Sequence, residues 1–163
     1  MGQEEPEAGE LAAEALRTDG VTVLTGARVR QVAHDGAEFT VRLEGEAEPR
    51  RAERLLVATG RYSDLTELGV DAVGLDATAR AVPTDGRMRA ADGLRAVGDI
   101  TGRAAYTHVS MYQAQLAVQD ILGRPGPDAD YRALPRVTFT APEIAAVGLT
   151  ERQARDRGLR VRP

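Results

Sequence analysis

The sequence predicts an α/β fold, and three features of the chain support this prediction. Short apolar segments that are typical of strands each end in a glycine, at residues 54–60 and 94–98. Segments with apolar residues at helical spacing occur at residues 4–17 and 109–122. Apolar and polar residues alternate on both sides of the Asp-Gly pair at 35–36, which predicts a β-hairpin. Strands and helices therefore share the chain, as the α/β class requires.

The first third of the chain is predicted to hold a helix, a strand and a hairpin. The helix covers residues 4–17 and begins with acidic residues, where the helix dipole favours negative charge. Gly20 would end this helix. Residues 21–26 are a strand candidate, and residues 27–45 would form the hairpin. The predicted apolar stripe of the helix consists of Leu11, Ala15 and Leu16.

The middle of the chain is predicted to contain a loop-rich segment, a buried strand and a helix. Residues 61–93 are rich in Asp and Gly and hold only short strand candidates. Residues 94–97 would form the strand, and residues 109–122 the helix. Residues 123–128 are a candidate linker. The predicted apolar face of the helix comprises Met111, Ala114, Gln115, Ala117, Val118, Ile121 and Leu122.

The last segment of the chain, after the candidate linker, is predicted to contain short strands and one helix. The residues that favour strands lie in two segments, 137–140 and 145–149. Thr150 and Gln153 have capping-box spacing, which predicts a helix over residues 151–157 with Gly158 after its end. Residues 159–163 would begin a further strand. The predicted opening helix has no strand before it and this last strand has no partner, so we expect an internal fragment of a larger protein.

The composition excludes several classes of function. The net charge is −4, and no basic face for nucleic acid is evident. The 21 basic residues are all arginine, which excludes a Schiff-base lysine and a P-loop lysine. With no cysteine the chain has neither a disulfide nor a thiol nucleophile, and His34 and His108 lack the spacing of a metal site. No apolar run predicts a membrane span or a secretory signal, so we expect a cytoplasmic protein.

The segment around Gly98 and Asp99 has the features of a nucleotide site. In open α/β sheets, ligands bind beyond the carboxyl ends of the strands. Gly98 would let a ligand approach the backbone, and Asp99 could accept hydrogen bonds from ribityl or ribose hydroxyls. Thr107 is a candidate N-cap of the next helix, whose free N–H groups would suit an electron-rich ring edge. From these residues alone, Asp99 could equally serve only to cap or turn the loop.

Three motifs then follow one another in a recognisable order. They are LLVATGR at residues 55–61, AVGDITG with AAYTHVS across residues 96–110, and PRVTFTAPEIAAVGLTERQA at residues 135–154. Together they resemble the pyridine nucleotide-disulfide oxidoreductases of class I, the flavoenzymes that include dihydrolipoamide dehydrogenase and mercuric reductase. The resemblance implies pieces of two doubly wound domains, for FAD and for NAD(P), and the start of an α+β interface domain.

The resemblance also implies which residues touch the cofactors. Asp99 matches the acid that binds the ribityl chain, and residues 105–108 match the stretch whose backbone lies against the isoalloxazine. Gly60 and Val29 match positions near the nicotinamide nucleotide, NAD or NADP. Alternatively, His108 only begins a helix and Val29 is a core residue of the hairpin. The implied FAD contacts are Gly98, Asp99, Ala105, Tyr106, Thr107 and His108, and no residue of the chain is assigned a catalytic or metal-binding role.

The same resemblance divides the chain into three parts. Residues 1–60 would be the C-terminal part of the NAD(P)-binding domain, residues 61–126 the second segment of the FAD-binding domain, and residues 127–163 the truncated start of the dimerisation domain. The family's GxGxxG motifs, redox-active cysteine pair and C-terminal His-Glu pair do not occur in the sequence.

The implied parent enzyme passes electrons between a nicotinamide cofactor, FAD and a disulfide or metal-ion acceptor, and it forms homodimers. Its partners would be the nicotinamide nucleotide and a small-molecule or disulfide substrate, with no nucleic acid and no membrane. We expect the chain alone to be inactive and to bind FAD poorly, because half of the cofactor site is missing. The alternative is a non-catalytic remnant or a partner-binding module.

Overall fold

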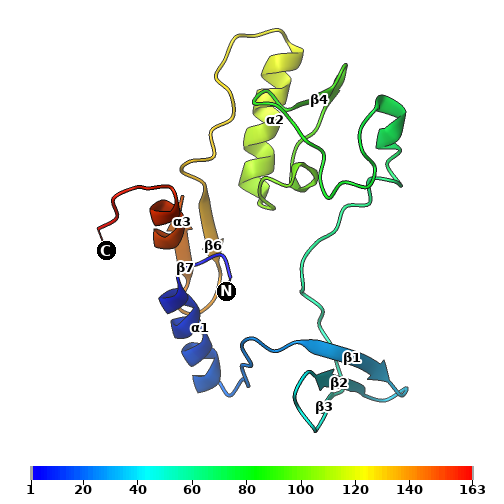
Figure 1. Ribbon diagram of the computed structural model, residues 1–163, viewed down its shortest axis with the longest axis vertical. Coiled ribbons are helices and arrows are strands. Elements are labelled where there is room, and N and C mark those ends of the chain that lie inside the picture. The colour runs from blue at the N-terminus through cyan, green and yellow to red at the C-terminus, as the bar shows by residue number, and fades with distance from the viewer. Residues whose placement is uncertain (1, 163) are drawn as a thin grey trace. The chain divides into compact units, whose positions relative to one another are not determined.

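A computed structural model describes residues 2–162 of the chain (Figure 1). The chain divides into two compact units. The first unit contains Gly2 and residues 6–60, and the second contains residues 3–5 and residues 61–162. Within the described residues, no helix combines the length and the apolar character that crossing a bilayer requires. Each unit is described by itself below.

The first unit consists of one helix and a three-stranded antiparallel sheet. Its elements are α1 (Pro6–Thr18), β1 (Val29–His34), β2 (Phe39–Leu43) and β3 (Arg50–Ala52), and the strand order is β1-β2-β3 (Figure 1). Asp35 tightens the turn between β1 and β2, because its Oδ1 accepts hydrogen bonds from the backbone N–H groups of Ala37 and Glu38, at 2.9 and 3.0 Å. The structure confirms the hairpin and the first helix; β3 was not predicted.

Two strand predictions in the first unit are wrong. Residues 21–26 and residues 54–60 belong to no sheet in the described part of the chain. The second of these segments leaves its apolar side chains in solvent, with Leu56 89% and Val57 69% exposed. An apolar run forms a strand only where neighbouring strands pair with its backbone, and neither run has such a neighbour here.

The predicted apolar stripe of α1 is also wrong. The structure buries Ala12 and Ala13, whereas Leu11 is 53% and Leu16 is 39% exposed. The two buried residues of the helix therefore carry small side chains, and the larger leucines face solvent. Helical spacing identifies a possible apolar face, but the tertiary contacts decide which side of the helix is covered.

The second unit contains two α-helices, two 3₁₀ turns and two short antiparallel sheets. The strand pairs are β4 (Arg89–Ala91) with β5 (Leu94–Arg95), and β6 (Pro135–Thr138) with β7 (Ile144–Val147). The helices are α2 (Thr107–Ile121) and α3 (Glu151–Asp156), and the 3₁₀ turns are Val70–Val73 and Asp99–Thr101. The predicted strand at residues 94–97 is thus shorter than expected, and residues 159–162 form no strand.

A small apolar cluster supports the segment around Gly98. It is formed by Leu65, Val70 and Val82, with Ala96 and Ile100 packed against it. Leu65 is 1% exposed, so the cluster is closed to solvent at its centre. The Gly98-Asp99 turn lies between two residues that pack on this cluster.

Of the predicted apolar face of helix α2, only Ala117 is buried. The buried residues of the helix are Val109, Gln113, Ala117 and Asp120, two of which are polar. The predicted face leaves Met111, Val118, Ile121 and Leu122 at least half exposed. The helix therefore makes its contacts within the unit through polar side chains as well as apolar ones.

Asp120 joins helix α2 to the β4-β5 pair. Its buried carboxylate accepts hydrogen bonds from the guanidinium groups of Arg89 and Arg95, with both Nε atoms 2.9 Å from Oδ2. These bonds, first from Arg89 and then from Arg95, lower the pKa of Asp120 from 3.8 to about 2. Charge-assisted pairing therefore fixes α2 to the β4-β5 pair, whose second strand lies shortly before the Gly98 turn.

Helix α3 confirms the predicted capping box. The Thr150 Oγ1 accepts a hydrogen bond from the backbone N–H of Gln153 at 3.2 Å, and the Gln153 Oε1 accepts one from the backbone N–H of Thr150 at 3.0 Å. Gly158 follows the helix with a left-handed φ of 73°, as a C′ glycine does. The N-terminus of α3 is set by contacts between residues three positions apart, which explains why the predicted capping box is correct.

Candidate functional site

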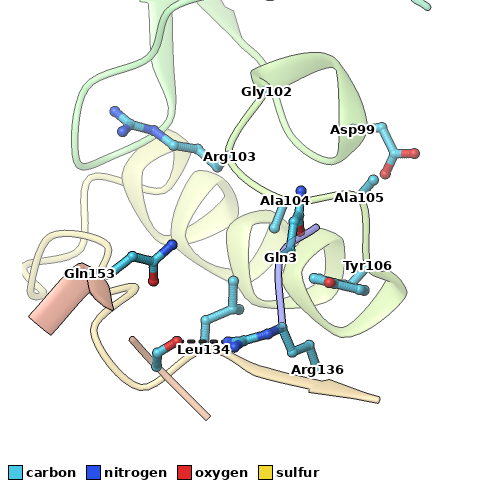
Figure 2. A pocket seen from close by; sticks show the side chains of 11 residues that line it. Gln3, Asp99, Gly102, Arg103, Ala104, Ala105, Tyr106, Leu134, Arg136 and Gln153 are labelled. Atoms are coloured by element: carbon cyan, nitrogen blue, oxygen red, sulfur yellow. Dashed lines mark hydrogen bonds between the residues drawn. The ribbon is translucent and has the colours of Figure 1, made fainter. Parts of the chain in front are cut away.

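A cavity of about 570 Å³ lies beside the start of helix α2 (Figure 2). Asp99 and loop residues 102–106 line one side of it, and Arg136 and Gln153 lie across from that loop. Arg136 is already paired, because its Nε donates to Glu4 at 2.8 Å and its Nη1 donates to the Gly148 carbonyl at 2.6 Å. Two of the donor groups of Arg136 are therefore already occupied.

Asp99 is the anionic group of this cavity. Its Oδ2 accepts a hydrogen bond from Nη1 of Arg61 at 3.0 Å, and its side chain is 44% exposed. The same Nη1 donates to the carbonyl of Ala105 at 3.3 Å. Arg61 thus connects the carboxylate to the loop that leads into α2, and sequence analysis did not identify this residue.

Gly98 adopts a backbone conformation that only glycine accommodates. Its φ and ψ are 83° and −155°, and a Cβ on this residue would lie 3.0 Å from the Oγ of Ser110. Its N–H donates to the side-chain oxygen of Gln113 at 2.6 Å, and its carbonyl accepts from the backbone N–H and hydroxyl of Thr101. Hydrogen bonds to the peptides on both sides of Gly98 therefore determine how Asp99 leaves the turn.

The start of α2 differs from the predicted cap. Tyr106 is the N-cap residue and Thr107 is the first helical residue, so the prediction of Thr107 as N-cap is wrong. The Tyr106 side chain caps nothing, and its carbonyl accepts from the N–H groups of Val109 and Ser110. A tyrosine N-cap supplies no oxygen to the first turn, which leaves N–H groups at the helix start for another acceptor.

His108 connects the helix start to the next strand pair. Its Nε2 lies 2.9 Å from the carbonyl of Pro135, so this nitrogen carries a proton and donates. Its ring stacks on Tyr106 with 5.4 Å between centroids and 12° between planes. Tyr106 lines the cavity, so His108 supports an aromatic ring at the cavity wall.

The two residues expected near the nicotinamide nucleotide lie in the first unit. Val29 is the first residue of β1, pairs with Leu43 and is 59% exposed. It is therefore not a core residue of the hairpin, which removes that alternative. Gly60 is the last residue of the unit and has a φ of 129°. The structure thus places the six expected FAD residues in one unit and these two in the other.

Sequence analysis missed Arg61 and Gln113. Arg61 follows Gly60 directly in the first motif, so its position was visible but its contact was not. Gln113 lies four residues after Val109 and four before Ala117, and both of these are buried. A glutamine at that spacing predicts a buried amide that needs hydrogen-bond partners, and this signal could have found it.

The polar and aromatic groups of the cavity fit part of a flavin nucleotide. A carboxylate, free helix N–H groups and a flat aromatic edge suit a polyhydroxyl chain joined to a planar, electron-rich ring. A cavity of about 570 Å³ matches part of such a molecule. Within residues 2–162, no group of three or more His, Cys, Asp or Glu side chains could hold a metal ion.

Comparisons of the sequence with known proteins agree with this geometry. Residues 1–120 match the pyridine nucleotide-disulphide oxidoreductases, and residues 134–162 match the dimerisation domain of the same enzymes. The mercuric reductase of Bacillus cereus is 33% identical over 97% of this chain, and the dihydrolipoyl dehydrogenase of Mycobacterium tuberculosis is 38% identical over 85%. The chain spans only 26% and 31% of these two relatives.

Solved structures give the same result. The Cu(II) complex of the HOCl-induced flavoprotein disulfide reductase RclA from Escherichia coli has a TM-score of 0.83 and 28% identity over 97% of this chain and 36% of that one. LpdA from Mycobacterium tuberculosis has a TM-score of 0.83 and 27% identity, over 95% of this chain and 34% of that one. These similarities confirm the predicted fold class.

The matched family consists of FAD-dependent enzymes that use NAD(P)H, so the predicted cofactors are those of the family. The family match extends over most of the chain, and it includes both the Gly98-Asp99 turn and the start of α2. The chain therefore belongs to the pyridine nucleotide-disulphide oxidoreductase family.

Proposed function

We propose that this chain is a segment of an FAD-dependent NAD(P)H oxidoreductase and supplies one part of its flavin site. The observation that carries the proposal is the cavity at the start of α2, where Asp99 and the Tyr106 ring meet free helix N–H groups. The parent enzyme would pass electrons between the nicotinamide cofactor, the flavin and a disulfide or metal-ion acceptor in the cytoplasm. The relatives named mercuric reductase and dihydrolipoyl dehydrogenase support both kinds of acceptor.

The residues of the cavity would bind and orient the flavin. The bound flavin would accept a hydride from NAD(P)H and release electrons to the acceptor. Asp99 would accept hydrogen bonds from ribityl hydroxyls, and Arg61 would hold its carboxylate in place. The helix start around residues 105–108 would present N–H groups and dipole charge to the ring edge where negative charge develops.

The domain assignment follows from the same proposal. Residues 1–60 would complete an NAD(P)-binding domain, with Val29 and Gly60 near the nicotinamide nucleotide. Residues 61–126 would be the second segment of the FAD-binding domain. Residues 127–163 would begin the dimerisation domain, and the match over residues 134–162 supports homodimers of the parent enzyme.

The chain alone would not turn over NAD(P)H. It contains no cysteine for a redox disulfide and no GxGxxG for a dinucleotide pyrophosphate. The apolar segment at residues 54–60 would pair with strands outside the chain, which would account for its exposure. Oxidation of NADH or NADPH above the rate of free flavin would contradict this statement.

A titration of the chain with FAD, followed by flavin fluorescence, tests the proposed flavin site. Weak saturable binding is expected for the unchanged chain, because much of the cradle is absent. Asp99→Ala should weaken it about tenfold, as loss of a charged hydrogen-bond acceptor does. Asp130→Ala is the matched control, because Asp130 is 49% exposed and also paired with an arginine, Arg132. Equal affinity of the two variants would contradict the assignment of Asp99.

A further inference from the structure

Gln113 is the most deeply buried polar side chain next to the candidate flavin site. It lies in the middle of α2, and its exposed fraction is 0%. Its amide makes three hydrogen bonds, all to groups outside its own helix. The Oε1 accepts from the N–H of Gly98 at 2.6 Å, and the Nε2 donates to Thr101 Oγ1 at 3.2 Å and to Tyr131 Oη at 2.9 Å.

These partners fix the orientation of the amide. The backbone nitrogen of Gly98 can only donate, so the amide oxygen must point toward it. Both N–H groups of the amide are then used by hydroxyl oxygens. A side chain that is fully buried and fully bonded has one arrangement, because rotation would leave buried polar atoms without partners.

The network determines the shape of the turn that presents Asp99. Gly98 receives the amide oxygen on its N–H, while its carbonyl is held by Thr101, which is itself bonded to Gln113. Gln113 therefore holds the peptide before Gly98 directly, and it supports the peptide after Gly98 through Thr101. Asp99 itself remains 44% exposed at the cavity and has no such anchor of its own besides Arg61.

The network also connects the turn to a segment beyond the helix. Tyr131 follows α2 in the chain, and its ring packs edge-on against Tyr112 with 6.2 Å between centroids. The Tyr112 hydroxyl accepts a hydrogen bond from the N–H of Asp130 at 2.8 Å. Gln113 thus lies between the turn on one side and an anchored segment on the other.

We propose that Gln113 is a positioning residue of the flavin site: its buried amide sets the conformation in which the Gly98-Asp99 turn presents the carboxylate to the cofactor. The part of this statement that concerns the cofactor rests on the proposed function. The part that concerns the turn rests on the three hydrogen bonds alone. An experiment with two separate measurements can therefore distinguish a failure of one part from a failure of the other.

The test uses three variants of the 163-residue chain. Gln113→Met keeps the length of the side chain and removes its hydrogen bonds. Gln113→Glu keeps an oxygen that accepts from Gly98, and the Tyr131 hydroxyl can rotate to donate to the new carboxyl group, while the Thr101 hydroxyl keeps its bond to the Gly98 carbonyl. Gln115→Met makes the same change at an exposed position on the same helix and is the control.

The first measurement is amide hydrogen exchange at Gly98 by NMR, with amides of the β1-β2 hairpin as the internal reference. Gln113→Met should speed exchange at Gly98 about tenfold or more, because one buried hydrogen bond is lost. Gln113→Glu should retain most of the protection, and Gln115→Met should change nothing. Unchanged exchange at Gly98 in Gln113→Met would overturn the proposal.

The second measurement is the FAD titration. Gln113→Met should lose about tenfold in FAD affinity, as Asp99→Ala does, and Gln113→Glu should restore it. Fast exchange at Gly98 with unchanged FAD affinity would overturn the positioning role. If FAD affinity is insensitive to Asp99→Ala, the proposed function fails, and the exchange data still decide whether Gln113 holds the turn.

Tyrosine fluorescence shows whether a variant has unfolded, because all four tyrosines lie in the second unit. If Gln113→Met is unfolded, Gln113→Glu alone carries the test. A folded Gln113→Glu with Gly98 protected and FAD affinity retained supports the proposal. The same variant with Gly98 unprotected and FAD affinity retained overturns it.

Discussion

Residues 54–60 and residues 94–98 look alike in the sequence and differ completely in the structure. Both are short apolar runs that end at a glycine, and both are predicted as buried strands. The first belongs to no sheet and leaves Leu56 89% exposed. The second pairs with β4, packs Ala96 on the Leu65 cluster, and has its Gly98 peptide bonded to Gln113. The difference lies in their partners and not in their own residues.

This comparison shows what makes a segment a binding element. A backbone is ordered only when its polar groups are paired and its apolar side chains are covered. The second segment receives both kinds of support from residues at least fifteen positions away, such as Gln113 and Leu65. Its glycine can therefore hold a conformation that a ligand could use. The first segment is also short, apolar and ended by a glycine, but it lacks that support.

The two segments should differ most in how much the free energy of unfolding changes when a leucine is shortened to alanine. Leu65→Ala removes a side chain that is 1% exposed beneath the second segment and should lower the free energy of unfolding by about 2–5 kcal/mol. Leu56→Ala removes an exposed side chain of the first segment and should change it by less than about 0.5 kcal/mol. Urea unfolding followed by far-ultraviolet circular dichroism would measure both. A Leu56→Ala variant as destabilised as Leu65→Ala would break the comparison.

The two terminal glycines should differ by a smaller amount. Gly98→Ala forces a Cβ to 3.0 Å from Ser110 Oγ at a φ of 83°, where hydrogen bonds prevent relaxation, and should cost about 1–3 kcal/mol. Gly60 also has a positive φ, but within residues 2–162 and apart from its two chain neighbours, no atom lies within 4 Å of an added Cβ. Its unpaired segment can rotate to another conformation, so Gly60→Ala should cost less than about 0.5 kcal/mol. Equal urea midpoints for the two alanine variants would contradict this explanation.

The same contrast explains which parts of the structure could be predicted from the sequence. The Asp35 turn and the capping box of Thr150 and Gln153 depend on contacts within four residues, and both predictions are correct. The buried face of α2 and the loss of the strand at residues 54–60 depend on residues that are distant in the chain. Helical periodicity does not contain that information, because several faces of α2 are apolar enough to be buried.

The candidate site also has a part that could be predicted from the sequence and a part that could not. The motif around Gly98 and Asp99 was recognisable, because the sequence itself specifies a strand end, a glycine and an acid. The contacts of Arg61 and Gln113 were not, because they join residues 38 and 15 positions apart. Sequence reasoning therefore found the residues that would face a ligand and missed those that would hold them.

Acid should act on the second segment through Asp120, which is bonded to Arg95. The pKa of Asp120 is lowered from 3.8 to about 2, so the folded state favours the carboxylate. Its contribution to stability is therefore complete above about pH 4 and is lost as the pH falls toward 2. Asp120→Asn should lower the urea midpoint at pH 7, detected by tyrosine fluorescence, and should flatten the change between pH 4 and 2.

Asp130→Asn is the control for this pH effect. The pKa of Asp130 is also about 2, through hydrogen bonds from Arg132 two residues later. That pair is exposed and local, whereas Asp120 connects α2 with β4 and β5. Asp130→Asn should thus leave most of the acid dependence in place. If it removed the dependence and Asp120→Asn did not, the arginine contacts of Asp120 would not anchor the second segment.

The smallest expected effect concerns the ion pair of Arg61 and Asp99. Both side chains are substantially exposed, at 72% and 44%, so a double-mutant cycle with Arg61→Ala and Asp99→Ala should give a coupling of about 0.2–1 kcal/mol in urea unfolding. The bond competes with solvent on every side, and salt should weaken it further. A coupling well above this range would mean that Arg61 helps to hold the turn, a role the structure gives mainly to Gln113. A coupling near zero would leave Asp99 free to exchange its arginine for a ligand hydroxyl, since the turn beneath it would keep its shape without the pair.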